Sequence, residues 1–189
     1  MILMQYLKNA TAAAVFGVYF KINSIFFMPV FGLNGAAISI LAFNYGARQP
    51  KRITKTLKYS LGAAFTLLVI GLLVFQLLPD VLLNIFNPTA DFLVIGRSAL
   101  QIISWSFPMA AIGIALSASF QAMGNGMYST ITSLCRQLLV LVPAAYLLSL
   151  LGEVTLVWWA FPIAEVVSMA VTLLFFLRLY KKKIRPMYE

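Results

Sequence analysis

Histidine is absent from this chain of 189 residues, and cysteine and acidic side chains are scarce. The single cysteine, Cys135, excludes an internal disulfide bond, and the lack of histidine removes a common ligand of zinc and haem. No GxxxxGK motif occurs, so the usual ATP-binding loop is missing as well. These absences predict a protein without a metal or a cofactor.

Charged residues are also rare, and their rarity decides the class of protein. They make up 10% of the chain, whereas a soluble domain carries about a quarter. Hydrophobic residues make up 62%, and the mean hydropathy is +0.93. We therefore predict an all-α, polytopic integral membrane helix bundle that forms one transmembrane domain over residues 1–189. Its short loops leave no room for an enzyme domain outside the membrane, and we predict no catalytic residue.

Five apolar blocks are long enough to cross a bilayer as helices, because a span needs about 20 apolar residues. They cover residues 10–45, 59–78, 92–118, 128–151 and 156–177. The first block is long for one helix, and a bend at Pro29 or a tilt would accommodate its length. The alternative divides it at Lys21 into two short spans, which gives six. Because Gly32 and Gly35 follow Pro29, these three residues are the candidate positions of a helix bend.

The net charge of +9 is concentrated at two places in the chain. Ten of the fourteen basic residues lie in two clusters, each at the end of an apolar block: Arg48, Lys51, Arg52, Lys55 and Lys58, and then Arg178, Lys181, Lys182, Lys183 and Arg185. Basic loops are retained in the cytoplasm, so both clusters should lie there, and residues 178–189 should form a basic cytoplasmic tail. This distribution argues against a nucleic-acid partner.

The number of spans agrees with this orientation. Four blocks lie between the two clusters, and an even number of crossings returns the chain to the same side. The loops expected outside carry Asp80, Asp91 and Glu153 but no basic residue. We predict a multi-pass plasma membrane protein with a cytoplasmic C-terminus. Residues 1–9 are too short to span and are expected to be the tail of a sixth helix, which makes the chain a fragment or one half of a longer protein.

Two opposite charges are expected deep in the membrane, where charged groups are costly and often functional. Glu165 and Arg136 lie on consecutive spans, each roughly 15 Å from a membrane surface, and therefore at nearly the same depth. One interpretation is a structural ion pair that neutralises both charges. In the other, Glu165 exchanges Arg136 for a proton or a cationic substrate during transport.

Three further polar residues are candidates for lining a cavity. Lys21 follows several aromatic residues and precedes Asn23, so aromatic and amide groups are expected around it, although a lysine at this depth could also extend to the membrane surface. Gln137 follows Arg136 and could line the same cavity or cap a helix near the interface.

Several runs of residues resemble one family of membrane transporters. The run AVFGVYFKINSIFFMPVFGLNGAAISILAFNYGARQPKR resembles the eighth helix and the following loop of the multidrug and toxic compound extrusion (MATE) transporters, especially Firmicute-type members. LLNIFN, ALSASFQAMGNG and CRQLLVLVPAAYLL resemble the outside loop, the tenth helix with its turn, and the eleventh helix. The resemblance covers essentially the whole chain in the right order.

The resemblance implies the C-terminal lobe of a twelve-helix antiporter, from the end of helix seven to helix twelve. Such an antiporter exports drugs, often organic cations, in exchange for protons or sodium by alternating access. It would need the missing N-terminal lobe as partner. Some members use a carboxylate in the tenth helix for coupling, but residues 92–121 contain none. Two alternatives remain, namely a flippase for lipid-linked precursors or polysaccharide, and a membrane fragment that transports nothing.

Overall fold

The computed structural model describes residues 10–188, and every regular element in this range is a helix. In chain order the elements are α2 (Ala10–Gly46), α3 (Pro50–Leu77), α4 (Pro79–Asn84), α5 (Ala90–Ser104), α6 (Phe107–Ala122), α7 (Gly126–Leu134), the π-helical η1 (Cys135–Leu141), α8 (Val142–Ser149), α9 (Val154–Trp158), α10 (Ala160–Leu179), the π-helical η2 (Tyr180–Ile184) and the 3₁₀-helical η3 (Arg185–Met187). The predicted all-α class is confirmed. The expected tail of an earlier helix at residues 1–9 lies outside the described residues.

Four stretches of helix in the described part are long and apolar enough to cross a membrane: Ala10–Gly46, Pro50–Leu77, Gly126–Ser149 and Val154–Met187. The pair α5 and α6 makes a fifth if it is counted as one bent span. Helix α2 passes through Lys21 and Pro29 without interruption, so the division into two short spans at Lys21 is not what the structure contains. The predicted bend near Pro29 stays a prediction.

The third apolar block is not one continuous helix. Helix α5 ends at Ser104, and α6 begins at Phe107 after a bend of 45°. The cause is Pro108, which lacks an N–H group and whose ring would collide with the carbonyl group of Ser104 in a continuous helix. Trp105 and Ser106 instead donate backbone hydrogen bonds to carbonyl groups three residues earlier, which tightens the chain at the bend.

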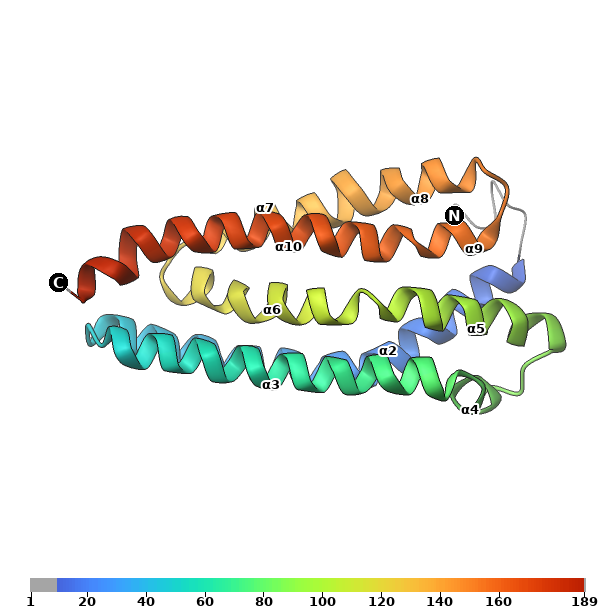
Figure 1. Cartoon of the computed structure of the whole chain (residues 1–189), viewed down its shortest axis with the longest axis horizontal. Helices are drawn as coiled ribbons and strands as arrows, with labels where there is room; N and C mark the ends of the chain where they lie inside the picture. Colours follow the sequence, from blue (N-terminus) through green and yellow to red (C-terminus); the bar gives the residue numbers. More distant parts are fainter. Residues whose placement is uncertain (1–9, 189) are drawn as a thin grey trace.

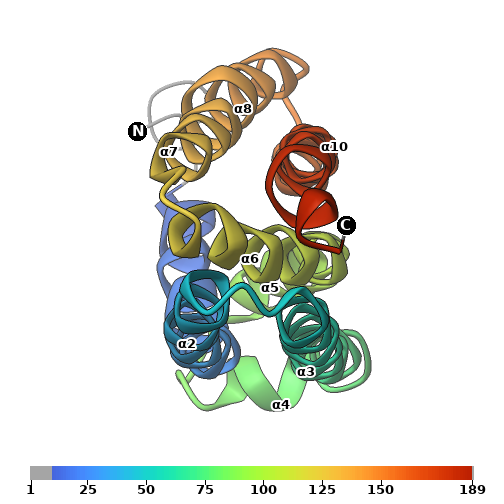
Figure 2. The same ribbon diagram turned by 90° about the vertical axis from the view of Figure 1, so that its left-hand side faces the viewer.

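The helices form a layered bundle with α5 and α6 in the middle. Figure 2 shows α2 and α3 on one side of this central pair, and α7, α8 and α10 on the other. Large buried side chains such as Phe75, Phe107 and Trp158 fill the principal core. Many large apolar side chains point outward instead, including Phe43, Leu139 and Leu174. Such a surface suits a lipid environment.

Both basic clusters lie at the same end of the bundle. In Figure 1 the turn between α2 and α3 and the C-terminus are at the left end, while the loops on either side of α4 are at the right. The C-terminal helices pack there, because Leu179 and Ile184 join Ile53 and Leu57 in a second buried cluster. Tyr188 also lies within hydrogen-bonding distance of Thr54, at 2.9 Å between the two hydroxyl oxygens. The fold thus unites charges that are far apart in the sequence.

Candidate functional site

Arg136 and Glu165 form an ion pair between η1 and α10. Nη1 of Arg136 donates a hydrogen bond of 2.7 Å to Oε1 of Glu165. The structure therefore contains the pair that the equal depth of the two residues predicted. Phe161, one turn before Glu165 on α10, contacts the buried ring of Tyr19 on α2, with centroids 6.1 Å apart. The ion pair therefore lies near a ring contact between α2 and α10.

The local backbone at Arg136 is unusual for a membrane span. Residues Cys135–Leu141 are π-helical, and the N–H of Val142 donates to the carbonyl oxygen of Gln137, five residues earlier. Pro143 follows directly and lacks an N–H group, so the regular ladder of hydrogen bonds is already interrupted there. Wide turns of this kind are frequent at functional sites.

An open groove runs along α7 and η1, with a volume of about 820 Å³. Most of the residues that line it have polar side chains, and Arg136 is the charged one. The lining residues are Gln121, Gly126, Ser129, Thr130, Ser133, Leu134, Arg136, Gln137 and Leu138. The polar members recur at three- and four-residue spacing, so one face of this span is polar although its sequence is apolar enough for lipid.

The structure separates Lys21 and Asn23 from this groove. Neither residue lines it. Phe16 and Tyr19 point inward and contact the ring of Phe161, with centroids 5.7 and 6.1 Å apart. Lys21 lies two residues beyond Tyr19, or about 200° around the helix, and is exposed. Phe16 and Tyr19 of the aromatic wall expected around Lys21 thus face the core of the bundle, whereas Phe20 is exposed as Lys21 is. Asn23 is half-buried, and its Oδ1 has no hydrogen-bond partner among the residues described.

The candidate bend residues lie on the outer side of α2. Pro29, Gly32 and Gly35 are all exposed. A Cβ atom added at either glycine would meet no other atom within 4 Å. Close packing therefore does not require glycine at these two positions.

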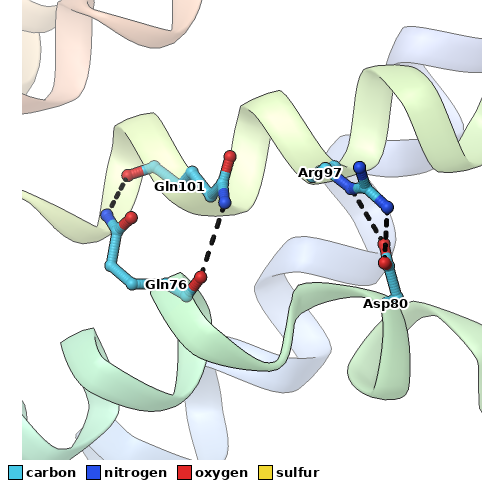
Figure 3. Close-up of polar contacts among 4 residues, drawn as sticks. All are labelled: Gln76, Asp80, Arg97 and Gln101. Carbon is cyan, nitrogen blue, oxygen red and sulfur yellow. Dashed lines mark hydrogen bonds and ion pairs between the residues drawn. The ribbon is translucent and has the colours of Figure 1, made fainter.

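Two other polar pairs lie toward the opposite end of the bundle, and Figure 3 shows both. Arg97 on α5 binds Asp80 on α4, with Nε of Arg97 3.0 Å from Oδ1 of Asp80. Gln76 on α3 bonds with Gln101 on α5, and the sequence did not single out Gln76. A glutamine near the end of an apolar block was the available signal, but nothing local in the sequence indicates its partner.

Comparisons with known proteins agree with this architecture. The sequence profile of the MatE family matches residues 1–147. The chain is 27% identical over 182 residues to a protein of Bacillus subtilis named Probable multidrug resistance protein YoeA, covering 95% of this chain and 39% of that protein. It is 28% identical over 163 residues to a protein of Shewanella oneidensis named FAD transporter, covering 82% and 34%.

A solved structure described as MATE in the bent conformation superposes with a TM-score of 0.90 at 21% identity, covering 100% of this chain and 42% of that one. The similarity extends to the fold. The chain spans less than half the length of each of these proteins.

Proposed function

This chain belongs to the MatE family, and we propose from that membership that it is the C-terminal lobe of a secondary active multidrug efflux antiporter. The complete transporter would export drugs or organic cations and take up protons or sodium in exchange. A relative named as a multidrug resistance protein supports the efflux of drugs. Another is named an FAD transporter, so family membership alone does not restrict the cargo to drugs.

The observation that carries the proposal is the exposed polar face of α7 and η1. A membrane span with Arg136 and several hydroxyl and amide groups on an open face is costly in lipid. Such a face is stable when it borders a water-filled path or an opposing lobe. The limited coverage of the relatives supports a second, N-terminal lobe that would close this side. We propose the five predicted spans as the membrane crossings of the lobe.

The efflux proposal is tested with a transporter in which this chain is joined to its N-terminal lobe. Assays in inverted membrane vesicles or in whole cells would follow export of a fluorescent drug driven by a proton or a sodium gradient. We expect export with one of the two gradients and none without a gradient. Export that depends on ATP would contradict the antiporter function. So would the absence of export from a transporter that is expressed at a normal level.

Orientation follows from the charge at the two ends of the bundle. Both basic clusters at one end support a cytoplasmic location of that end and of the C-terminus in the plasma membrane. A test uses Cys135→Ser as background and adds Thr54→Cys at the basic end or Asp91→Cys at the other. An impermeant maleimide added to intact cells should label only the Asp91→Cys variant. Labelling of Thr54→Cys from outside would show that the protein has the opposite orientation.

We propose Glu165 as the coupling residue of this lobe, with Arg136 as the partner that it exchanges for a proton. The titratable groups around the carboxylate are Arg136 on η1 and Tyr19 on α2. Glu165→Gln should make export insensitive to external pH, because the amide cannot release a proton. Glu153→Gln in the exposed loop is the matched control and should behave like the wild type. If export by Glu165→Gln keeps the pH dependence of the wild type, Glu165 is not the coupling residue.

The bend residues of α2 supply a second proposed element of the transport cycle. Pro29, Gly32 and Gly35 would let α2 flex beside the cavity during alternating access. Because alanine fits at both glycines without a clash, Gly32→Ala with Gly35→Ala tests flexibility alone. We expect slower export at unchanged expression. Wild-type export by this double variant would refute the flexing role.

A further inference from the structure

The ion pair of Arg136 and Glu165 presents its two charges unequally. The side chain of Arg136 is 42% exposed and lines the groove along α7 and η1. The side chain of Glu165 is 13% exposed and is not part of the groove wall. A molecule in the groove therefore meets the guanidinium first and the carboxylate only behind it. The pair is neutral overall, but its positive end faces the open side.

The guanidinium also keeps unused hydrogen-bonding capacity. An arginine carries five N–H donors in a planar fork, and Arg136 uses Nη1 for Glu165. The remaining donors have no acceptor among residues 10–188 in the structure. Such a fork binds planar oxyanions such as carboxylates, or phosphate groups, through two parallel bonds. An organic cation would be repelled at the same position.

The rest of the groove wall matches an oxyanion and its polar surroundings. No acidic side chain lines the groove within the described residues. Gln121, Ser133 and Gln137 are lining residues whose side chains make no hydrogen bond in the described part of the chain. Each can donate to an oxygen atom of a ligand. The volume of about 820 Å³ is within the range for a drug-sized molecule.

We propose that this groove is a subsite for the carboxylate or phosphate group of an amphiphilic substrate, with Arg136 as its anchor. The inference rests on the proposed transport function and specifies the cargo: the substrate carries an oxyanion that this lobe binds. A cationic group on the same substrate is bound outside this groove, away from the guanidinium. Gln137 and Ser133 orient the oxyanion beside Arg136.

The test measures binding to the purified transporter, in which this chain is joined to its N-terminal lobe, in phosphatidylcholine nanodiscs. The probes are 7-diethylaminocoumarin-3-carboxylate, its neutral carboxamide and a coumarin phosphate, with fluorescence anisotropy as the measurement. Wild type should bind both anionic probes more tightly than the carboxamide. Arg136→Gln should weaken binding of the anionic probes at least about tenfold, the usual effect of losing a charged hydrogen bond, and leave the carboxamide unchanged.

Glu165→Gln should change the affinity for the anionic probes in the opposite direction from Arg136→Gln, and it shows whether a variant has lost its fold. It removes the counter-charge from Arg136, so the anionic probes should bind more tightly, and a misfolded protein cannot produce tighter binding. A cation subsite predicts the reverse, which ethidium binding to the same two variants would reveal. Arg97→Gln breaks an ion pair at the other end of the bundle and is the matched control. Its affinity for all probes should equal that of the wild type.

Several results would overturn the inference: no preference of the wild type for anionic probes, equal affinity in Arg136→Gln, or the reversed pattern with ethidium. Displacement of the probes by added phosphatidylglycerol would assign the groove to lipid phosphate and also overturn it. Because this binding assay requires no transport, it fails independently of the efflux assay. If export occurs but the anionic probes do not bind more weakly to Arg136→Gln and more tightly to Glu165→Gln, only the subsite is rejected. If the probes do bind in this way but no export occurs, only the transport function is rejected.

Discussion

Gln76 on α3 and Gln101 on α5 each donate a side-chain hydrogen bond to the backbone carbonyl oxygen of the other, at 2.7 and 3.4 Å (Figure 3). The arrangement follows from the bend in the third span. Trp105 donates its backbone N–H to Ile102 at the bend, which frees the carbonyl of Gln101 from its usual helical partner. Gln76 and Ser104 both donate to that carbonyl. Gln76 therefore supports the bent span from the neighbouring helix α3.

Replacing Gln76 should destabilise the protein more than replacing Gln101. Gln76 also bonds to Ser104, at 3.1 Å, whereas Gln101 makes one longer bond. We expect Gln76→Leu to lower the free energy of unfolding by about 1 kcal/mol and Gln101→Leu by about half as much, in line with hydrogen bonds between membrane helices. Unfolding in detergent by titration with sodium dodecyl sulfate measures both. The reverse order would show that the bond to the freed carbonyl contributes little.

Glycines on α2 and α3 should respond to alanine in opposite ways. A Cβ atom at Gly71 would lie 3.0 Å from the ring of Phe26, which packs against the core, and 3.3 Å from that of Phe107, which is buried in it. Gly71→Ala should lower the free energy of unfolding by about 1–3 kcal/mol, because these rings cannot move without disturbing their neighbours. Gly32→Ala is the control. It should leave stability equal or raise it by up to about 1 kcal/mol through better helix propensity.

The same detergent titration measures this pair of variants. Equal loss of stability in Gly71→Ala and Gly32→Ala would contradict the packing at Gly71. A large loss in Gly32→Ala alone would mean that the outer face of α2 is covered in the complete protein.

The C-terminal segment should detach when its buried anchor is removed. Ile184 is fully buried against the ends of α3 and α6. Lys183 before it is half-buried and donates to the carbonyl oxygen of Met123, while Lys181 and Lys182 are exposed. Ile184→Ala truncates the one fully buried side chain within residues 180–188, a loss of about 2–5 kcal/mol for a buried isoleucine. Cleavage after Lys181–Lys183 should then become faster.

Tyr188→Phe serves as the control for this release. It deletes only the hydroxyl that contacts Thr54, so cleavage should remain close to the wild-type rate. Limited proteolysis followed by mass spectrometry measures both variants. Unchanged cleavage in Ile184→Ala would contradict the docking of the segment.

The pair of Arg97 and Asp80 should matter little for stability despite its good geometry. Both side chains are about half exposed, so water and salt compete with the contact. Arg97→Gln should leave the thermal midpoint close to the wild-type value, and the small difference should shrink further at high salt. A marked loss of stability that salt does not reduce would point to a buried environment of this pair in the complete protein.

The amino-acid sequence by itself determined the class of structure. Long apolar blocks with few charges leave helices as the stable form in lipid, because each helix satisfies its own backbone hydrogen bonds. The two basic clusters and the even number of blocks between them predicted one common end for both, and the bundle has them there. Span number and orientation depend on the hydropathy and charge of successive segments, so they can be predicted without knowing how each helix is rotated about its axis.

Only the tertiary structure decided which polar groups meet. The depth of Arg136 and Glu165 followed from counting residues, but their contact depends on the rotation of two helices about their axes. Mean hydropathy is the same for every rotation of a helix about its axis, so it does not tell which side chains face one another. For this reason the partner of Gln76 could not be predicted. For the same reason Lys21 was expected beside Phe16 and Tyr19, which face the core. Pro108 was visible in the sequence, yet the carbonyl group that its bend frees acquires its partner on α3 only when α3 packs against α5. Rotation and packing, which arise together on folding, therefore assign the polar residues of this bundle to their sites.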